Sequence, residues 1–471
     1  MKTECTPVTM EFQGVGRRKV EGSFDGGHLS SEGGALLLRE TDERFNIIDR
    51  FADCFTDHRD EELVEHPVDT MLRQRIFGLA LGYEDLNDHD KLRLDPLMAL
   101  ASGKEDLEGK ERRCEEDRGK PLASKSTLNR LELTPEDADK DSRYKKLVYH
   151  GERIEDFLMT LFLESIKETP DELVLDFDAT DIPLHGEQEG RFFHGYYNNY
   201  CYLPLYVTCG DEVLVAKLRR SNIDACAETV PVLAQLVERI RVRFPDVRII
   251  LRGDSGFARE EIMAWCEAND VHYVLGLAKN TRLIKIIEKA MDTAKLRSCL
   301  TGVAAREFVT FPYQTKKSWT RARRVIGKAE CLPKGSNPRF IVTNLTEDYA
   351  TPQGLYEDTY CARGDMENRI KEQQLDLFAD RTSTGTMRAN QLRLWFSLMA
   401  YVLMRRLRSV ALHGTEMAKA TCGTIRTKLL KIAVQIKISV RRVAIHLPTA
   451  CPCQDVFVRA WKALQQMPQR C

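Results

Sequence analysis

Residues 172–184 read ELVLDFDATDIPL, and this stretch decides the fold class. Leu175 and Phe177 alternate with Asp176 and Asp178, which is the period of two that separates the faces of a β-strand. A carboxylate in the middle of a strand is costly unless it is paired or binds a cation. The stretch therefore predicts a strand with one apolar face and one acidic face.

The text that follows predicts a mixed sheet covered by helices. Runs of β-branched and aromatic residues predict two further strands, over 201–210 and 212–221. Helical and strand patterns then alternate, over 227–244, 247–256, 259–270 and 272–279. Three consecutive strands followed by this alternation are typical of an α/β domain. Strand patterns over 306–315, 321–331 and 338–345 resemble an insertion rich in β-structure.

The two ends of the chain differ from this central part. Residues 1 to about 45 have a glycine-rich sequence typical of strands and turns, and a helical pattern runs from residue 35 past residue 160. Apolar faces with basic flanks predict helices over 389–409 and 424–436. We therefore expect a mainly helical region over 1–165, a core over 166–302, a β-rich insertion over 303–345, the rest of the core over 346–410, and a basic helical region over 411–471.

Charge is distributed unevenly along the chain. The 471 residues are 43% hydrophobic with a net charge of −1, an ordinary globular composition. Residues 381–471, however, contain 16 Lys or Arg and only two acids, Glu416 and Asp455. Such a basic segment favours a polyanion partner such as nucleic acid, because Lys and Arg neutralise phosphates. A solvated basic surface is the alternative.

Several classes of protein are not indicated. No charged segment followed by an apolar core and a cleavage site opens the chain, and its longest apolar run, LWFSLMAYVLM, is too short to span a bilayer. We therefore expect a cytoplasmic protein that does not bind membranes. The chain has no G-x-x-x-x-G-K-[ST] stretch, so no nucleotide cofactor is expected.

Three carboxylates are candidates for one site. Asp178 lies on the acidic strand, Asp254 ends the apolar strand IILRGD, and Glu367 lies between Arg363 and Lys371 in YCARGDMENRIKE. Ligand sites in α/β sheets form at the carboxyl ends of strands, and metal-dependent phosphoryl transfer needs several acidic ligands with cations nearby.

Each candidate has an alternative. Asp176 or Asp181 could be the ligand instead of Asp178, and Asp254 could simply stabilise a turn. The triplet around Glu367 has helical spacing, so it could consist only of ion pairs worth a few tenths of a kcal/mol each.

Four stretches and a signature carry a resemblance to a known family. These are LDFDATD, HGEQEGRFFHGYYNNYCYLPLYV, LRGDSGF, FADRTSTGTMRANQLRL and Tyr360-x2-Arg363-x3-Glu367. Together, over residues 170–410, they resemble the DDE-class transposases of bacterial insertion sequences, in the branch with a tyrosine-arginine-glutamate-lysine signature. The resemblance implies a ribonuclease H-like mixed-sheet core interrupted by a β-strand insertion.

The resemblance also implies roles for residues. The family's catalytic metal-binding triad falls on Asp178, Asp254 and Glu367, and its DNA-binding tyrosine and arginine fall on Tyr360 and Arg363. The position of the signature lysine is occupied by Gln374. Lys371 lies one helical turn nearer on almost the same face, so we expect it to substitute.

The activity implied by the resemblance is cut-and-paste DNA transposition. Two Mg²⁺ ions, with Mn²⁺ as a substitute, would support cleavage at the element's ends and transfer of the 3′-hydroxyl into target DNA. The implied partners are double-stranded DNA, at the terminal inverted repeats and at the target, and a second copy of the chain on bacterial nucleoid DNA. The alternatives are a metal-dependent nuclease without strand transfer and a DNA-binding protein that no longer cuts.

Other residues are candidates for DNA contacts. Trp319, in the basic text TKKSWTRARR, is a candidate platform for a base, with packing inside the insertion as the alternative. Lys125 and Arg130 lie in LASKSTLNRLEL, which predicts a capped helix that either reads DNA or is an ordinary surface helix. The stretch FHGYYNNY could touch DNA or pack at a strand edge.

Overall fold

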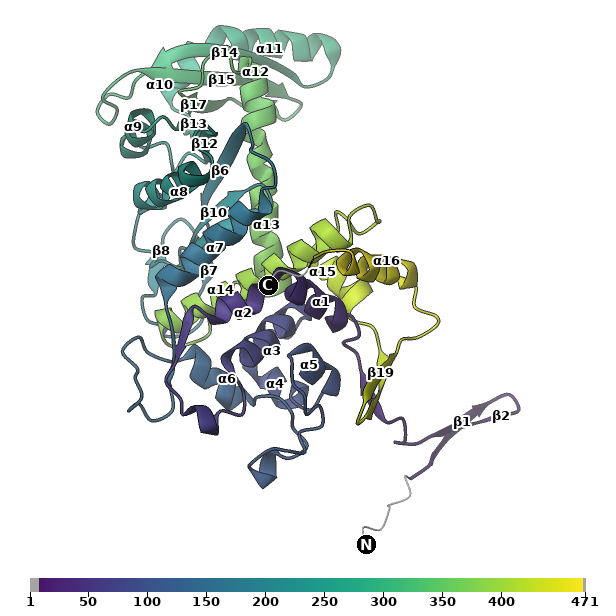
Figure 1. The fold of residues 1–471 in the computed structure, drawn as a ribbon. Helices are drawn as coiled ribbons and strands as arrows, with labels where there is room; N and C mark the ends of the chain where they lie inside the picture. Colours follow the sequence, from purple (N-terminus) through teal and green to yellow (C-terminus); the bar gives the residue numbers. More distant parts are fainter. Residues whose placement is uncertain (1–7, 469–471) are drawn as a thin grey trace. The chain divides into compact units, whose positions relative to one another are not determined.

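The computed structural model describes residues 8–468 and divides the chain into two compact units (Figure 1). The first unit comprises Met1–Tyr149, Asp376–Phe378 and Met399–Cys471, and the second comprises His150–Leu375 and Ala379–Leu398. The second unit thus begins at His150, ahead of the boundary expected at residue 165. Helix α7 (Gly151–Ser165) belongs to the second unit because Met159 and Phe162 are buried in that unit's core.

A nine-stranded mixed sheet is the framework of the second unit. Its strands are β6 (Glu172–Ala179), β10 (Leu205–Cys209), β11 (Glu212–Lys217), β12 (Arg248–Gly253), β13 (His272–Leu277), β14 (Ala305–Tyr313), β15 (Arg323–Leu332), β16 (Gly335–Ser336) and β17 (Arg339–Thr343). The first five follow the order β11-β10-β6-β12-β13, in which β10 is antiparallel to β6 and β12 is parallel to β6 and β13. The predicted α/β mixed-sheet fold is confirmed.

The β-rich text over 303–345 extends this same sheet. β17 pairs antiparallel with β13, β15 pairs with β17, and β14 forms the far edge. A lone edge strand leaves a row of unpaired N–H and C=O groups, and here the inserted strands satisfy those groups along β13. The insertion is therefore continuous with the core sheet.

Helices cover both faces of the sheet. One face packs against α7, α8 (Thr229–Arg243), α9 (Glu260–Ala268), α10 (Thr281–Ile286) and α11 (Glu288–Thr301). On β6 this face carries Leu175 and Phe177, both fully buried. The opposite face packs Ile250 and Val274 against Leu355 and Tyr356 of a separate helical segment. Asp176 and Asp178 alternate with the apolar residues, as the period of two predicts.

That helical segment is irregular, and it carries the Tyr-x2-Arg-x3-Glu signature. It begins with α12 (Pro352–Gly354) and a π-helical turn at Leu355–Tyr360, continues through a 3₁₀ turn at Cys361–Arg363 and α13 (Gly364–Lys371), and ends in a second π-helical turn at Glu372–Asp376. Short π-helical turns inside helices occur frequently at functional sites.

A small sheet of order β7-β9-β8 also follows β6, with β7 (Ile182–Pro183), β8 (Phe192–His194) and β9 (Asn199–Tyr202).

The first unit is mainly helical. Its N-terminal part contains β1 (Met10–Val15), β2 (Arg18–Gly22), β3 (His28–Ser30), α1 (Ala35–Phe45), α2 (Ile47–Ala52), β4 (Phe55–Asp57), α3 (Val68–Ala80), α4 (His89–Leu92), α5 (Pro96–Ala101), α6 (Lys125–Glu132) and β5 (Leu147–Tyr149). Helix α6 begins at the N-cap Ser124, whose side chain accepts from the Thr127 backbone N–H. The capped helix predicted there is confirmed.

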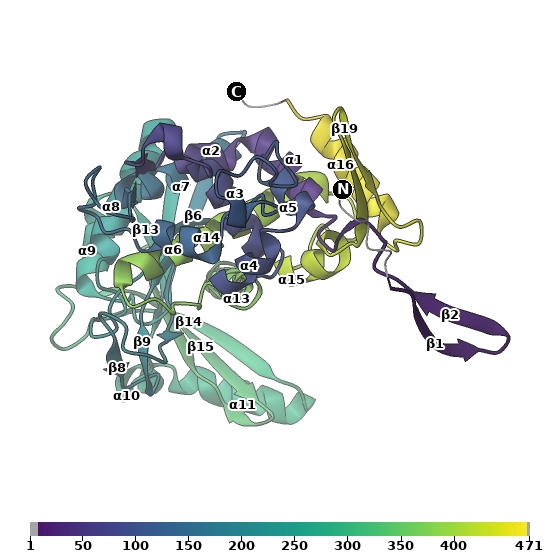
Figure 2. The same ribbon diagram turned by 90° about the horizontal axis from the view of Figure 1, so that it is seen from below.

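The C-terminal region is less helical than expected. After α15 (Cys422–Ile425) and a π-helical turn at Arg426–Leu430, the chain forms β18 (Val434–Ser439) and β19 (Arg442–His446), then α16 (Gln454–Gln465). The helix expected over 424–436 is thus wrong from residue 434 onward, because Val434 and Ile436 point to one face of a strand and pack in an apolar cluster. β18 pairs with β3, and α16 packs beside this sheet (Figure 2).

Helix α14 (Met387–Arg406) contains the apolar run noted in the sequence, and no helix within residues 8–468 is both long and apolar enough to cross a membrane.

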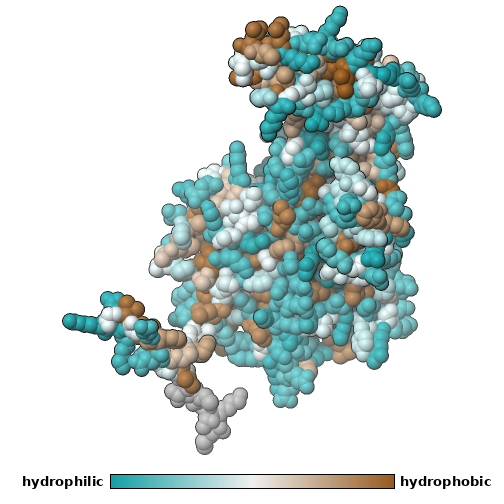
Figure 3. Space-filling model, turned by 180° about the vertical axis from the view of Figure 1, so that it is seen from behind, coloured by the Kyte–Doolittle hydropathy of each residue, from teal (hydrophilic) through white to brown (hydrophobic). Residues whose placement is uncertain are grey.

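Leu296, Leu300 and Val303 are exposed at the end of α11, where Figure 3 shows a hydrophobic patch on the surface of the second unit.

Candidate active site

Asp178 and Asp254 lie beside each other at the carboxyl ends of two parallel strands. In the register of β6 and β12, Gly253 is opposite Phe177, so the next residues along the two strands are Asp254 and Asp178. Asp254 Oδ1 accepts from the Gly256 N–H at 2.8 Å, which fixes the turn after β12. Asp178 Oδ1 accepts from the Ala179 N–H at 3.0 Å. The sheet register therefore holds two carboxylates that are distant in sequence at one edge.

Glu367 reaches this edge from the helical segment. Arg363 Nη2 donates to Glu367 Oε1 at 2.7 Å, the helical spacing of four that the sequence shows. The same guanidinium also lies 3.6 Å from Asp178 Oδ2 through its Nη1. Arg363 thus makes the ion pair expected of an ordinary helix, but it also connects that helix to the acidic strand.

All three carboxylates line one cavity of about 570 Å³. Arg363, Lys371 and Gln374 line it from the helical segment, and Ser255 and Gly256 line it from the turn after β12. Lys371 and Gln374 therefore both face the cavity, as the near coincidence of their helical faces predicts. The structure brings the predicted triad together with two cations.

The negative charge in this cavity is only partly compensated. Burial raises the pKa of Asp178 to about 6, Arg363 opposes the rise, and the neighbouring Asp254 and Glu367 add to it. Burial lowers the pKa of Arg363, but the charges of Asp178 and Glu367 outweigh it and the net pKa is raised. A group whose pKa is shifted by burial and by like charges in a cleft is typical of a functional site.

The donor set fits a divalent cation. Carboxylate oxygens are the hard ligands that Mg²⁺ and Mn²⁺ prefer, and a cation would relieve the repulsion that raises the pKa of Asp178. Within residues 8–468, no three acidic, histidine or cysteine side chains already stand close enough to form a ready metal site. Arg363 lies between Asp178 and Glu367, so it acts as the internal counter-ion in this conformation.

Asp176, the alternative ligand, is committed to a different contact. It is buried and forms a bidentate ion pair with Arg252 of β12, including a bond of 2.6 Å from Nη2 to Oδ2. Arg252 Nη1 also donates to the carbonyl of Thr359, in the π-helical turn that ends at the signature residue Tyr360. This buried pair therefore attaches the signature segment to the sheet. Arg252 was not predicted to have a role, although an arginine inside an apolar strand was a possible signal.

Asp181 also has a local partner. Asn199 Nδ2 donates to Asp181 Oδ2 at 3.1 Å, and Asp181 is not among the residues that line the cavity. Of the three acids in this stretch, only Asp178 faces the cavity.

Tyr360 is partly buried and packs against the sheet, and it is not among the residues that line the cavity. Its ring lies 5.6 Å from that of Tyr356, and burial raises the pKa of its hydroxyl. A Cβ added at Gly276 of β13 would lie 2.6 Å from the Tyr360 hydroxyl and 2.9 Å from the Ser255 backbone nitrogen. Gly276 therefore permits both the tyrosine and the Asp254 turn to approach the strand. A glycine inside a strand pattern is a known signal of such an approach.

Trp319 lies in the core of the second unit. It is 5% exposed and packs edge-to-face with Tyr313, with ring centroids 5.9 Å apart. The guanidinium of Arg323 lies 5.6 Å from the indole centroid. A base cannot stack on a ring buried in this way, so the placement matches the packing alternative.

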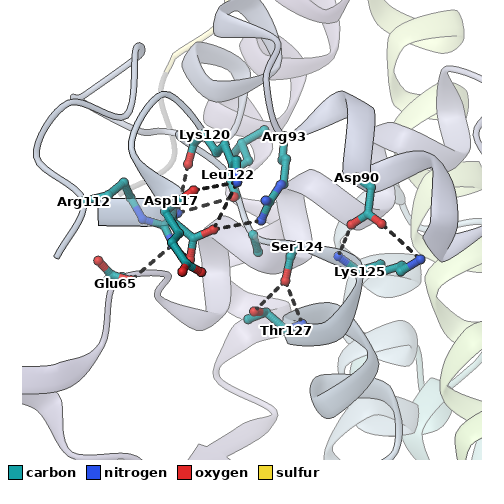
Figure 4. Close-up of polar contacts among 12 residues, drawn as sticks. Glu65, Asp90, Arg93, Arg112, Asp117, Lys120, Leu122, Ser124, Lys125 and Thr127 are labelled. Carbon is teal, nitrogen blue, oxygen red and sulfur yellow. Dashed lines mark hydrogen bonds and ion pairs between the residues drawn. The ribbon is translucent and has the colours of Figure 1, made fainter. Parts of the chain in front are cut away.

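Lys125 and Arg130 belong to the first unit and both make contacts there. Lys125 Nζ lies 3.1 Å from Asp90 Oδ2, and the Lys125 backbone N–H also donates to Asp90, as Figure 4 shows. The guanidinium of Arg130 lies 5.0 Å from the centroid of the Tyr144 ring. The Lys125 side chain is nevertheless about half exposed, at 47%.

An ion-pair network supports the loop before this helix. Arg112 lies 3.2 Å from Glu65 and 3.6 Å from Asp117, and Arg93 lies 3.4 Å from Asp117 (Figure 4). Arg112 also donates to the carbonyl of Lys120 at 2.9 Å. The start of α6 is thus held by several contacts in addition to its cap.

Comparison with known proteins identifies the family. No protein of curated function matches the chain. Among solved structures, a piggyBac transposase in a synaptic complex with hairpin DNA aligns with 84% of this chain and 79% of its own, at 10% identity and a TM-score of 0.42. The sequence profile described as transposase DDE domain group 1 matches residues 12–469. The chain therefore belongs to the DDE-domain transposase family.

Proposed function

We propose that this protein is a cut-and-paste DNA transposase of a bacterial insertion sequence, in which Asp178, Asp254 and Glu367 form the catalytic centre. The observation that carries the proposal is the meeting of these three carboxylates, from two strands and a helix, around one cavity that two cations also line. Family membership supports DNA cleavage and strand transfer as the class of reaction.

The residues of the site divide the work. The three carboxylates would hold divalent cations, preferably two Mg²⁺ ions, with Mn²⁺ as a substitute. Cations bound there supply the chemistry that activates a water and then a 3′-hydroxyl, and that stabilises charge on the phosphate. Arg363 and Lys371 are placed to bind the phosphates of the DNA strand, and Arg363 is the better suited to two-point contact because its guanidinium is planar.

Arg363 has a second part in this proposal. Its guanidinium now neutralises Asp178 and Glu367. With Asp178 and Glu367 holding divalent cations instead, the Arg363 guanidinium would be free to bind a phosphate oxygen. Tyr360, anchored at Gly276, and Arg252, bonded to the Thr359 carbonyl, hold the helical segment in place during this exchange.

The remaining DNA contacts belong to other parts of the protein. We assign recognition of the terminal inverted repeats to the first unit, with Lys125 and Arg130 of α6 as candidate contacts and the basic C-terminal region as phosphate-binding surface. We expect two copies of the chain to act together on the two ends of the element, in the bacterial cytoplasm.

Cleavage and strand-transfer assays on DNA carrying the element's ends test the proposal. Glu367→Gln removes one charge from the cavity, and Asp365→Asn is its matched control, because Asp365 is an exposed acid on the same helix that does not line the cavity. We expect the wild type and D365N to cut and join in Mg²⁺, and E367Q to bind DNA but not cut. Titration of Mn²⁺ in the absence of DNA should show weaker binding by E367Q than by D365N.

Other outcomes contradict the proposal. Cleavage without joined products would indicate a nuclease. DNA binding without cleavage by the wild type in Mg²⁺ or Mn²⁺ would indicate a DNA-binding protein derived from a transposase. Equal activity of E367Q and D365N would show that the Arg363–Glu367–Lys371 stripe consists only of helix ion pairs.

A further inference from the structure

A groove on the second unit lies between α7, α8 and the edge strand β11, and we call it the α7–α8 groove. Its volume is about 830 Å³, and its lining residues differ from those of the catalytic cavity. Figure 1 shows α7 and α8 side by side over the sheet. The floor of the groove is apolar and contains Met159, Leu214, Val215, Val232 and Leu236. Grooves of this volume and lining take up apolar side chains of a ligand or partner.

The rim of the α7–α8 groove is acidic. Two cations line it and both are already paired, Lys217 with Glu228 at 2.6 Å and Arg239 with Asp156. Three more glutamates line the groove without an ion-pair partner within residues 8–468, namely Glu152, Glu155 and Glu238. Five carboxylates against two cations give the groove a net charge of −3 when all are ionised.

Glu155 shows that this excess of negative charge is unfavourable. Burial raises its pKa, Lys217 opposes the rise, and the charges of Glu152 and Glu228 add to it. A partner that brings cations to the rim relieves this repulsion, because an opposite charge nearby favours the ionised carboxylate. DNA is a polyanion and is repelled by the same surface. The groove therefore fits a protein surface that is both basic and apolar.

Helix α16 of the first unit presents a surface of this kind. Its inner face is buried and consists of Val456, Ala460 and Leu464. Its outer face carries Val458 and Trp461, which are 39% and 48% exposed. Arg459 and Lys462 are exposed beside them. Spacings of three and four residues place these four side chains along one stripe of the helix. The outer face of α16 therefore combines an apolar centre with two cations.

The two surfaces complement each other. A large aromatic ring that folding leaves exposed gains apolar burial when a partner covers it, and tryptophan is enriched among the residues that carry binding energy. Trp461 and Val458 match the apolar floor, and Arg459 and Lys462 match the glutamates of the rim. Both surfaces occur in every copy of the chain, so two copies related by a twofold axis form the contact twice. The second contact doubles the buried area.

We propose that the α7–α8 groove of one copy binds the outer face of α16 of a second copy, with Trp461 in the groove and Arg459 and Lys462 at its acidic rim. The inference rests on the proposed function only for the expectation that two copies act together. It adds the surface through which they associate, and it assigns α16 to the partner copy instead of to DNA.

Charge reversal on each surface tests the docking site. The groove variant carries Glu152→Lys and Glu238→Lys, and the helix variant carries Arg459→Glu and Lys462→Glu. All four positions are exposed, so the variants should fold, and their thermal unfolding should match that of the wild type.

Two further variants complete the set. Trp461→Ala removes the apolar side chain from the helix and keeps both cations. The matched control carries Glu168→Lys and Glu261→Lys, which reverse two exposed acids of the second unit that do not line the groove. The control thus changes the net charge as the groove variant does.

Sedimentation equilibrium of the full chain, free and on DNA carrying the element's ends, measures self-association. We expect the groove variant and the helix variant each to associate roughly 10- to 100-fold more weakly than the wild type, and W461A roughly 30-fold more weakly. The control variant should associate like the wild type. An equal mixture of the groove and helix variants should associate again, because the reversed groove of one copy then meets the reversed helix of the other.

Several results would overturn the docking site. A wild type that stays monomeric both free and on DNA has no such contact. Unchanged association of the groove variant, or a mixture that does not recover, shows that the groove and α16 do not meet. A helix variant that binds DNA more weakly but associates normally assigns the outer face of α16 to the DNA-binding surface.

Failure of the docking site and failure of the proposed function give different results. If the wild type cuts and joins DNA but its association does not respond to the reversals, only the docking site is overturned. If the reversals weaken association and the mixture restores it, but the wild type neither cuts nor joins DNA, the docking site stands and the proposed function fails.

Discussion

Asp176 and Asp178 lie two residues apart on the same face of β6, and we predict that removing their charges has opposite effects on stability. Asp176 is the partner of Arg252, whose side chain is only 9% exposed. Asp176→Asn leaves that guanidinium buried without its counter-ion, and breaking a buried pair in this way costs about 3–5 kcal/mol. The hydrogen bond from the same guanidinium to the Thr359 carbonyl should weaken as well.

The charge of Asp178, in contrast, destabilises the folded state. Its pKa is raised from 3.8 to about 6, so the folded state binds more protons than the unfolded state between these two pH values. Stability therefore falls as the pH rises through this window, and above pH 6 the ionised carboxylate costs up to ~3 kcal/mol. Asp178→Asn removes that cost. We expect it to stabilise the second unit at pH 8, to have little effect below about pH 4, and to abolish cleavage.

Denaturant unfolding followed by tryptophan fluorescence measures both effects. Trp265, Trp319 and Trp395 belong to the second unit, so a Trp461→Phe background restricts the signal to that unit. The double variant Asp176→Leu with Arg252→Met should recover most of the loss caused by D176N, because an apolar pair avoids the cost of burying both charges. A shift of the unfolding midpoint in the same direction for D176N and D178N at pH 8 would refute this prediction.

Three further predictions concern single residues. Gly276→Ala should lower the free energy of unfolding by about 1–3 kcal/mol and reduce kcat, because its Cβ would meet the Tyr360 hydroxyl. The control Gly364→Ala, where a Cβ meets nothing within 4 Å, should raise the free energy of unfolding by about 0.5–1 kcal/mol. Equal effects of the two variants in unfolding and cleavage assays would contradict this prediction. Trp319→Ala should lower the free energy of unfolding by about 3–5 kcal/mol, because Trp319 is a core residue. A variant with unchanged stability but altered DNA binding would instead support Trp319 as a platform for a base. Lys371→Ala should reduce the slope of log K against log salt for DNA binding by about 1, and an unchanged slope would show that Lys371 does not contact a phosphate.

The sequence by itself determined the elements of the core and their faces. The alternation in residues 172–184 gave β6 its apolar and acidic sides, and helices α8 and α9 and strands β12 and β13 lie where periodicity placed them. These features depend on local spacing, which the sequence records directly. The three candidate carboxylates were named from the sequence because each occurs at a strand end or on a helix, and their proposed roles came from the resemblance to a known family.

Only the tertiary structure decided which residues meet. Asp176 and Asp178 share a face and cannot be told apart by spacing, but the register of β6 and β12 places Arg252 opposite Asp176 and leaves Asp178 facing the cavity. Tertiary pairing also decided the structure at Val434, which pairs with Ser30 in a strand although the local sequence predicted a helix. Tertiary contacts likewise decided the placement of Trp319, whose burial depends on Tyr313 and Arg323. Partners far apart in the chain determine burial, charge compensation and strand pairing. These properties decide that Asp178, and not Asp176, faces the cavity.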